Sequence, residues 1–274
     1  MTGRMEGKKA VVSGAGQLPH ELQGNGRAIA LTFAREGAEV ACADMYEERA
    51  RETAELIEAE GGTAHVVVAD ISDPDACARL IAEAHQAMGR VDTLVNNVGV
   101  NLNDGTPESL TVEGWTNIMN INLRGTWLVS KAVIPIMREQ GGGNITNISS
   151  VGSRTGGGTM SAYAISKAGV NELSHVLAVN YANDGIRCNT VLPSWIMTPH
   201  SMEGLIESGI AKTEDDVRAL AGRSIPLGKP GTAQDVANAV LWLSSEESRM
   251  VTGLEVPVDG GTLIMVGRYT KPGS

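Results

Sequence analysis

Short runs of apolar residues alternate with stretches of helical periodicity along almost the whole chain. Seven such runs predict strands, at residues 10–12, 39–43, 65–69, 91–95, 144–148, 187–192 and 254–258. The stretches between them carry apolar residues at helical spacing, as in Ala50, Ala54 and Ile57. Because the strands are apolar on both faces, helices must cover both sides of the sheet. The pattern predicts an α/β fold with a doubly wound parallel sheet of about seven strands.

The alternation continues over the 274 residues without a composition shift, a repeat or a low-complexity tract. We therefore expect a single domain over residues 1–274. Residues from about 194 to 223 combine turn residues with scattered apolar side chains, which fits a lid over a ligand. Residues from about 262 to 274 lack strong periodicity and are expected to form a flexible tail or a subunit contact.

The charge of the chain limits its partners. Lys and Arg number 22 against 32 Asp and Glu, which leaves a formal net charge of −10 that repels nucleic acids and anionic membranes. No run of apolar residues is long enough to span a membrane, so a soluble, cytoplasmic protein is expected. Three widely spaced cysteines predict reduced packing residues and no metal site.

A glycine-rich turn follows the first predicted strand. Gly14, Gly24 and Gly26 precede a helix that is expected to start near Gly26. Glycines at a strand-to-helix turn let backbone N–H groups approach a pyrophosphate, although a plain tight turn uses them equally well. No Lys-Ser or Lys-Thr follows, which disfavours a nucleoside-triphosphate loop.

Asp44 ends the second predicted strand, where an acid can accept both hydroxyls of an adenosine ribose. The alternative is that Asp44 only caps the next helix. We favour ribose binding because of the preceding glycines. Its charge would repel a 2′-phosphate, and no basic residue follows before Arg49, so NAD is expected over NADP.

Tyr163 and Lys167 lie four residues apart in a strongly helical stretch and therefore share a face. A nearby ammonium lowers the pKa of a phenol and lets it exchange a proton with an alcohol or a carbonyl. Ser150 ends an earlier predicted strand, at the sheet edge where doubly wound proteins bind ligands. Each signal is weak alone, since a strand-end Ser often only forms a turn, but together they favour a catalytic site.

The sequence resembles the short-chain dehydrogenases/reductases from Lys8 to about Thr262. The motifs that carry the resemblance occur in the family's order and spacing: the glycine turn, Asp70-Ile71, Asn96-Asn97-Val98-Gly99, Ile121-Asn122-Leu123, Ser150, Tyr163 with Lys167, Pro193 to Thr198, and Val258-Asp259-Gly260-Gly261. The resemblance implies a Rossmann fold and an oxidoreductase that needs no metal.

The resemblance also implies roles for individual residues. Tyr163 would be the acid/base, Ser150 would hydrogen-bond the substrate oxygen, and Lys167 would hold the nicotinamide ribose and lower the phenol pKa. Asn122, on a helix that begins near Glu113, would kink that helix and hold a water of a proton relay. An Asn inside a helix can instead only satisfy backbone groups. The implied cofactor contacts are Ser13, Gly14, Gly24, Asn25 and Gly26 at the pyrophosphate, Asp44 at the ribose, Asp70 and Ile71 at the adenine, Asn97 and Gly99 beneath the adenosine, Tyr163 and Lys167, and Ile196 with Thr198 at the carboxamide.

The chain departs from the family at three places. Nine residues separate Gly14 from Gly24, six more than the family usually has, and we expect Gln17–Leu22 to bulge outward while residues 24–26 still face the pyrophosphate. Ser13 replaces the usual Thr and retains its hydroxyl. Ser194 stands where the family usually has Gly, which is expected to stiffen the start of the lid.

The expected activity is hydride transfer between NAD(H) and an uncharged, hydrophobic or cyclic secondary alcohol or ketone, because the candidate substrate wall is mostly apolar. That wall is Val100, Leu102, Thr155, Met160, Trp195, Met197, Met202, Leu205 and Ile206. The lid side chains among them could equally pack on the core. A 3-oxoacyl-type ketoreductase and a non-catalytic NAD-binding protein stay as alternatives. Family members are commonly tetramers, so a homotetramer is expected.

Overall fold

The computed structural model of the chain describes residues 3–156, 158–202 and 211–265. Its main sheet is parallel, with the strand order β3-β2-β1-β4-β5-β6-β9. The strands are β1 (Lys9–Ser13), β2 (Glu39–Asp44), β3 (Thr63–Val68), β4 (Thr93–Asn96), β5 (Gly143–Ile148), β6 (Ile186–Pro193) and β9 (Glu255–Val258). All seven predicted strands are confirmed. A small second sheet pairs β7 (Ile196–Met197) with β8 (Gly231–Thr232).

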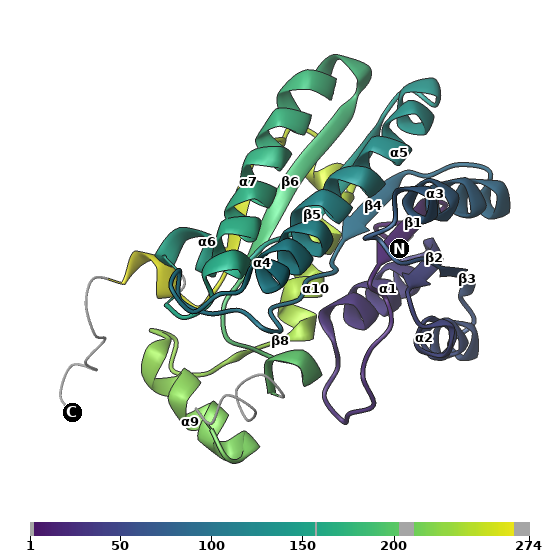
Figure 1. The fold of residues 1–274 in the computed structure, drawn as a ribbon. Coiled ribbons are helices and arrows are strands. Elements are labelled where there is room, and N and C mark those ends of the chain that lie inside the picture. Colours follow the sequence, from purple (N-terminus) through teal and green to yellow (C-terminus); the bar gives the residue numbers. More distant parts are fainter. Residues whose placement is uncertain (1–2, 157, 203–210, 266–274) are drawn as a thin grey trace.

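Helices cover both faces of the sheet, as the apolar strands require (Figure 1). The helices are α1 (Asn25–Arg35), α2 (Glu47–Ala59), α3 (Pro74–Met88), α4 (Val112–Met119), α5 (Thr126–Glu139), α6 (Gly152–Thr155), α7 (Ser161–Tyr181), α9 (Glu214–Ser224) and α10 (Ala233–Ser244). Short 3-10 turns are η2 (Ala182–Asp184), η3 (Glu246–Ser248) and η4 (Thr262–Ile264). None of the helices in the described ranges has the length and hydrophobicity to span a bilayer.

Alternate residues of each strand enter two separate cores. Val12 packs with α1, α2 and α10, whereas Val11 packs with α3, α5 and α7. The three cysteines are buried and unpaired, and burial raises the pKa of Cys42 and Cys188 to about 12. These thiols therefore behave as the expected packing residues.

The strand order reverses beside β1, because β2 and β4 flank it on opposite sides. The loops that leave β1 and β4 therefore diverge and open a crevice at the carboxyl ends of the strands, the usual ligand position in this architecture. Ser13 and Asn96 end these two neighbouring strands at the same level. The topology places the glycine turn at this edge.

A π-helical segment, η1 (Asn120–Gly125), joins α4 to α5 and contains Asn122. The wider winding interrupts an otherwise continuous helix where the kink was expected. Such π segments are frequent at functional sites.

The described part of the predicted lid contains β7, residues 198–202 and α9. Met197, Met202, Ala211 and Val217 form a small buried core of their own, and Leu22 of the inserted loop packs against it. The predicted wall residues Leu205 and Ile206 lie outside the described residues, as do residues 266–274 of the predicted tail.

Candidate active site

A cleft of about 650 Å³ opens at the carboxyl edge of β1, β4 and β5. It brings together every residue that the sequence predicted as a cofactor contact. They are Ser13, Gly14, Gly24, Asn25, Gly26, Asp44, Asp70, Ile71, Asn97, Gly99, Tyr163, Lys167, Ile196 and Thr198. Ser150 lines the same cleft, whereas Asn122 is buried behind it.

The glycine turn is shaped for a ligand at the start of α1. A Cβ on Gly26 would lie 1.8 Å from Gly14 O, so protein packing alone requires that glycine. Gly24 differs, because a Cβ there would meet nothing closer than 3.4 Å and its φ of −78° suits any residue. Asn25 Oδ1 is buried without a hydrogen-bond partner at the same turn. Gly24, Asn25 and Gly26 all line the cleft at the start of α1, which fits a pyrophosphate at this helix N-terminus.

Asp44 lies partly buried at the end of β2. Its carboxylate accepts hydrogen bonds from Gly16 N at 3.2 Å and Tyr46 N at 3.1 Å. Burial raises the pKa of Asp44, and these backbone bonds partly oppose that shift. The capping alternative is therefore partly met, because Asp44 bonds the residue before α2, yet its side chain still faces the cleft.

Asn97 and Gly99 follow β4 and hold the cleft together. Asn97 Nδ2 donates to Gly14 O at 2.9 Å, which ties this loop to the glycine turn. A Cβ on Gly99 would lie 2.9 Å from Lys167 Nζ, so the glycine leaves room for the ammonium. Asp70 and Ile71 follow β3. Asp70 accepts a hydrogen bond from Ser72 N at 2.9 Å, and the Ile71 side chain is buried.

Tyr163, Lys167 and Ser150 converge at the deep end of the cleft. Lys167 Nζ lies 5.7 Å from the centre of the Tyr163 ring and donates to Ile148 O at 2.9 Å. Ser150 Oγ accepts from Gly152 N at 3.1 Å and hydrogen-bonds with the phenol. Ser150 thus forms a turn, as its alternative role predicted, and also meets the tyrosine.

Burial governs the ionisation of this group. It raises the pKa of Tyr163, with the Ser150 hydrogen bond partly opposing the shift, and lowers the pKa of Lys167 to about 8. Burial dominates the ionisation of the phenol in the protein by itself, and the Lys167 ammonium is directed to Ile148 O. That Lys167 lowers the phenol pKa stays a prediction.

Asp104 caps α7, the helix that carries Tyr163 and Lys167, and was missed by the sequence analysis. Helix α7 has no side-chain cap of its own, and Asp104 accepts from Ala162 N at 3.0 Å and Tyr163 N at 2.8 Å. A carboxylate at a helix N-terminus satisfies open N–H groups and the helix dipole. Asp104 is remote from α7 in sequence, so no local pattern could have assigned it.

Comparison with known proteins identifies the family. The family described as Enoyl-(Acyl carrier protein) reductase matches residues 21–262. The 7alpha-hydroxysteroid dehydrogenase of Clostridium sardiniense is 35% identical over 271 residues, 98% of each chain. The chain belongs to the short-chain dehydrogenase/reductase family. A Burkholderia xenovorans protein assigned to this family is 38% identical in structure comparison, with a TM-score of 0.87 and coverage of 97% and 100%. The carveol dehydrogenase of Mycobacterium avium, solved in complex with NAD, is 31% identical, with a TM-score of 0.89 and coverage of 96% and 100%.

In this short-chain dehydrogenase/reductase, Asn122 is fully buried in the π segment. Its amide donates to Val100 O at 2.9 Å and Ser166 Oγ at 3.0 Å, and its Oδ1 accepts from Val100 N at 2.8 Å. The carbonyl of Asn122 accepts from Thr126 Oγ1 at 2.8 Å. The side chain thus fastens the loop after β4 to α7. The proposed water relay stays a prediction.

Ile196 and Thr198, the two residues predicted to contact the cofactor carboxamide, both interact with Ser201. Its hydroxyl donates to Ile196 O at 2.6 Å and lies 3.2 Å from Thr198 Oγ1, within the cleft. Ser201 was missed, although its position three residues after Thr198 is a recognisable turn spacing. Among the described residues of this family member, no cluster of His, Cys, Asp or Glu is arranged to hold a metal.

The predicted substrate wall is only partly correct. Val100 lines the cleft, but Met197 and Met202 are buried in the small core of the lid. Their assignment to the wall is wrong because these side chains pack against α9, as their alternative interpretation held. Leu102 and Met160 are exposed outside the cleft.

The inserted loop departs from a simple outward bulge. Its tip, at His20 and Glu21, is exposed, but Gln17 and Leu18 line the cleft. Gln17 Oε1 accepts from Gly24 N, and its amide donates to Leu22 O at 3.3 Å. The inserted loop is therefore part of the cleft wall, and Leu22 of this loop packs against the lid.

Proposed function

We propose that the protein is an NAD-dependent alcohol dehydrogenase or ketone reductase, acting on an uncharged, hydrophobic or cyclic secondary alcohol or ketone. The observation that carries this proposal is the convergence of Ser150, Tyr163 and Lys167 in the cleft that also holds the glycine turn and Asp44. A proton-transfer group and a dinucleotide cradle meet at one edge of the sheet.

The proposed chemistry divides between cofactor and protein. Bound NAD would supply the hydride acceptor and, through its cationic ring, positive charge that favours the phenolate. Tyr163 Oη takes the hydroxyl proton of the alcohol, and Ser150 Oγ hydrogen-bonds the same oxygen as its charge changes. Lys167 holds the ribose and carries its own proton at neutral pH, since its pKa is about 8. Reduction of a ketone runs these steps in reverse.

Asp44 supports NAD as the cofactor, because a carboxylate at this position accepts ribose hydroxyls and repels a phosphate. Arg49 is the residue in the cleft that opposes the assignment of NAD. Besides Lys167 it is the only Lys or Arg among the described residues that line the cleft, and its guanidinium lies 4.0 Å above the Tyr46 ring. The two residues make the choice between NAD and NADP directly testable.

The uncharged substrate is supported by the lining of the cleft. Val100 and Ile121 are among the apolar residues that line the cleft, and Lys167 and Arg49 are the only Lys or Arg among its described lining residues. Two relatives, named as hydroxysteroid and carveol dehydrogenases, support a hydrophobic alcohol.

The test is Tyr163→Phe, with Tyr181→Phe on the same helix as its control. NADH fluorescence measures cofactor binding, and NADH absorbance with a panel of alcohols and ketones measures turnover. Tyr163→Phe should bind NADH and lose nearly all turnover, whereas Tyr181→Phe should keep both. Substantial activity of Tyr163→Phe would refute the proposed acid/base.

Two alternatives predict different results in the same panel. A relative from Thermotoga maritima, 34% identical over 261 residues, is named a 3-oxoacyl-[acyl-carrier-protein] reductase. An enzyme of that type would reduce carrier-bound ketones with NADPH. A net charge of −10 disfavours docking of an acidic carrier. A non-catalytic NAD-binding protein would show no turnover, which the presence of Ser150, Tyr163, Lys167 and Asn122 disfavours.

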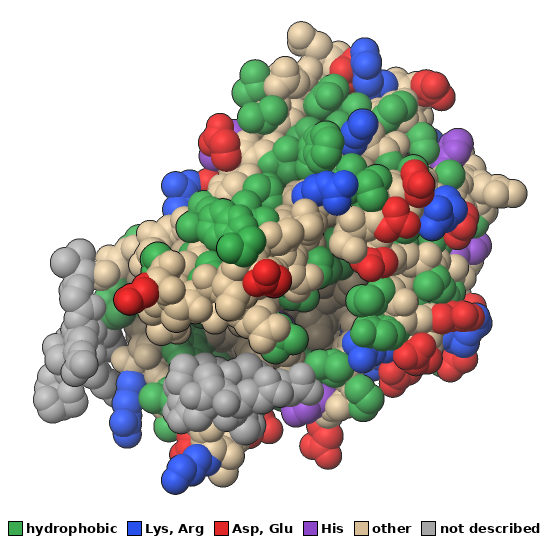
Figure 2. Space-filling view, viewed as in Figure 1, with side chains coloured by type: hydrophobic (Ala, Val, Ile, Leu, Met, Phe, Trp, Pro, Cys, Tyr) green, Lys and Arg blue, Asp and Glu red, His purple; other side chains and the backbone are tan. Residues whose placement is uncertain are grey.

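We also propose that the protein is a cytoplasmic homotetramer. Figure 2 shows hydrophobic side chains gathered over α4, α5 and α7. Exposed members on these helices are Val112, Trp115, Trp127, Ile165, Val176 and Val179. An exposed apolar patch over neighbouring helices is typical of a subunit contact. A monomeric mass by light scattering would contradict this assembly.

A further inference from the structure

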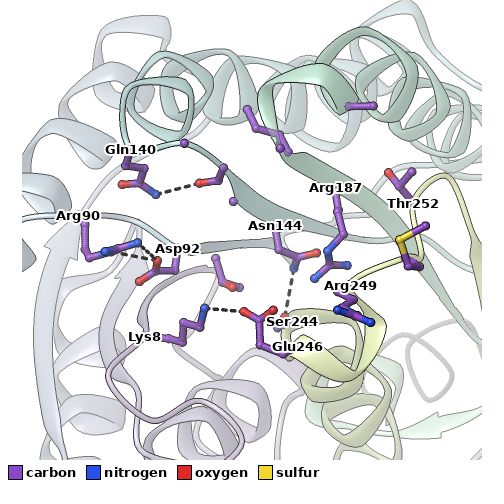
Figure 3. A pocket seen from close by; sticks show the side chains of 18 residues that line it. Lys8, Arg90, Asp92, Gln140, Asn144, Arg187, Ser244, Glu246, Arg249 and Thr252 are labelled. Atoms are coloured by element: carbon purple, nitrogen blue, oxygen red, sulfur yellow. Dashed lines mark hydrogen bonds and ion pairs between the residues drawn. The ribbon is translucent and has the colours of Figure 1, made fainter.

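A second cavity of about 520 Å³ lies at the opposite edge of the sheet from the catalytic cleft (Figure 3). It opens at the amino ends of the central strands, between Thr93 of β4, Asn144 of β5 and Arg187 of β6. Among the residues that the structure describes, none lines both this cavity and the catalytic cleft. The volume is within the range of sites for small molecules.

Positive charge exceeds negative charge around this cavity. Four basic side chains, Lys8, Arg90, Arg187 and Arg249, line it together with the two carboxylates of Asp92 and Glu246. This local surplus contrasts with the net charge of −10 on the whole chain.

The two carboxylates already have partners. Asp92 pairs with Arg90 at 2.5 Å and also accepts from Lys9 N at 2.8 Å. Glu246 pairs with Lys8 at 2.8 Å. The cations beyond these pairs are Arg187 and Arg249, neither of which makes an ion pair with a described carboxylate.

Arg187 is held in place by the backbone. Its guanidinium donates to Leu243 O at 2.9 Å and Val251 O at 3.2 Å, which neutralise none of its charge. Burial lowers the pKa of Arg187, and Glu246 nearby partly offsets this. Figure 3 shows Arg187 and Arg249 on one side of the cavity and Arg90 with Asp92 on the other. The carboxylate that acts on both Arg187 and Arg249 is Glu246, which already pairs with Lys8, so positive charge is left over for an anion.

Two buried polar atoms at the cavity lack partners. Asn144 is 3% exposed, and its amide donates to Thr146 Oγ1 and Ser244 Oγ, but its Oδ1 accepts nothing. Thr93 is 1% exposed, and its hydroxyl has no hydrogen bond. Both atoms are enclosed by protein atoms and are not open to a ligand in the cavity, so only the guanidinium groups point to a ligand. Figure 3 shows Asn144 between Arg187 and Ser244.

We propose that this cavity binds a small anion, of the chemical class of a phosphate monoester. The anion pairs with Arg187 and Arg249. The site is separate from the catalytic cleft and does not depend on the function proposed above.

Isothermal titration calorimetry with ribose 5-phosphate tests the site, with neutral ribose as the ligand control. The wild-type protein should bind ribose 5-phosphate and not ribose. Arg249→Gln, at an exposed position, should weaken binding about tenfold through loss of a charged hydrogen bond. Arg49→Gln removes a cation from the catalytic cleft instead and should leave binding unchanged.

Three results would overturn the proposal: no binding to the wild type, equal binding to Arg249→Gln, or loss of binding in Arg49→Gln. Arg187→Gln is a second variant in the cavity, but the loss of its two bonds to backbone carbonyls endangers folding. Thr93→Val keeps the shape of the side chain and removes only the hydroxyl. Because that hydroxyl is enclosed by protein, Thr93→Val should bind ribose 5-phosphate as the wild type does.

Discussion

Gln17 Oε1 accepts a hydrogen bond of 2.8 Å from the backbone N–H of Gly24, so the inserted loop is fastened to the residue that precedes α1. The same side chain donates to Leu22 O, which closes the loop on itself. Leu22 in turn packs against the small core of the lid. One glutamine thereby holds the lengthened turn against the helix N-terminus at the proposed cofactor site.

Gln17→Ala should therefore weaken cofactor binding. One lost hydrogen bond of about 1 kcal/mol predicts a rise of about fivefold in the Kd for NADH, with kcat unchanged at saturating cofactor. NADH fluorescence titration measures the Kd. Gln234→Ala is the control. The Gln234 amide of α10 donates to Thr32 Oγ1 of α1, and neither residue lines the cleft. Equal effects of the two changes would contradict a special role for Gln17.

Asp104→Ala should lower both stability and turnover. Loss of a helix cap costs about 1 kcal/mol of unfolding free energy, and here it loosens the turn that carries Tyr163. Urea unfolding and steady-state kcat measure the two effects. Asp73→Ala is the matched control, because Asp73 caps α3 away from the cleft through Asp75 N. It should lose similar stability and keep kcat; a parallel fall in kcat would argue against positioning by Asp104.

Lys167 should make stability depend on alkaline pH. Burial lowers its pKa from 10.5 to about 8, so the unfolded chain binds this proton more tightly than the folded protein. The cost, about 3 kcal/mol, is complete below about pH 8 and disappears as pH rises toward the unfolded pKa. Relative to Lys167→Met, the wild type should therefore gain stability between about pH 7 and about pH 10.

Urea unfolding of both proteins at these two pH values measures that gain. Lys131→Met, at an exposed position on α5, is the control. The difference in unfolding free energy between the wild type and Lys131→Met should be the same at both pH values. A difference between wild type and Lys167→Met that stays constant with pH would mean that Lys167 does not resist protonation in the folded state.

Asp44→Ala should shift cofactor preference toward NADP. The wild type is expected to prefer NAD, and removal of the carboxylate should change the ratio of kcat/KM values by about tenfold. Asp70→Ala is the control, because it removes the other carboxylate of the cleft and should affect both cofactors alike. Wild-type preference for NADP, abolished by Arg49→Ala, would reverse the assignment.

The strand positions follow from local patterns, because burial on both faces leaves a signature of consecutive apolar residues. Val40 to Ala43 needed no tertiary information to be read as a strand. The cofactor residues could be predicted for a related reason. Gly14 and Asn97 directly follow strands and Asp44 ends one, and parallel strands bring their carboxyl ends to one edge.

The sequence by itself determined the alternation, the glycine turn and the residue types of the catalytic group, since each depends on spacing along the chain. Only the tertiary structure decided that Asp104 caps α7, that Met202 packs inside the lid and that desolvation governs Tyr163. These outcomes depend on which distant segments exclude water from one another. Hydrogen bonding and ionisation respond to that exclusion, and no local pattern records it.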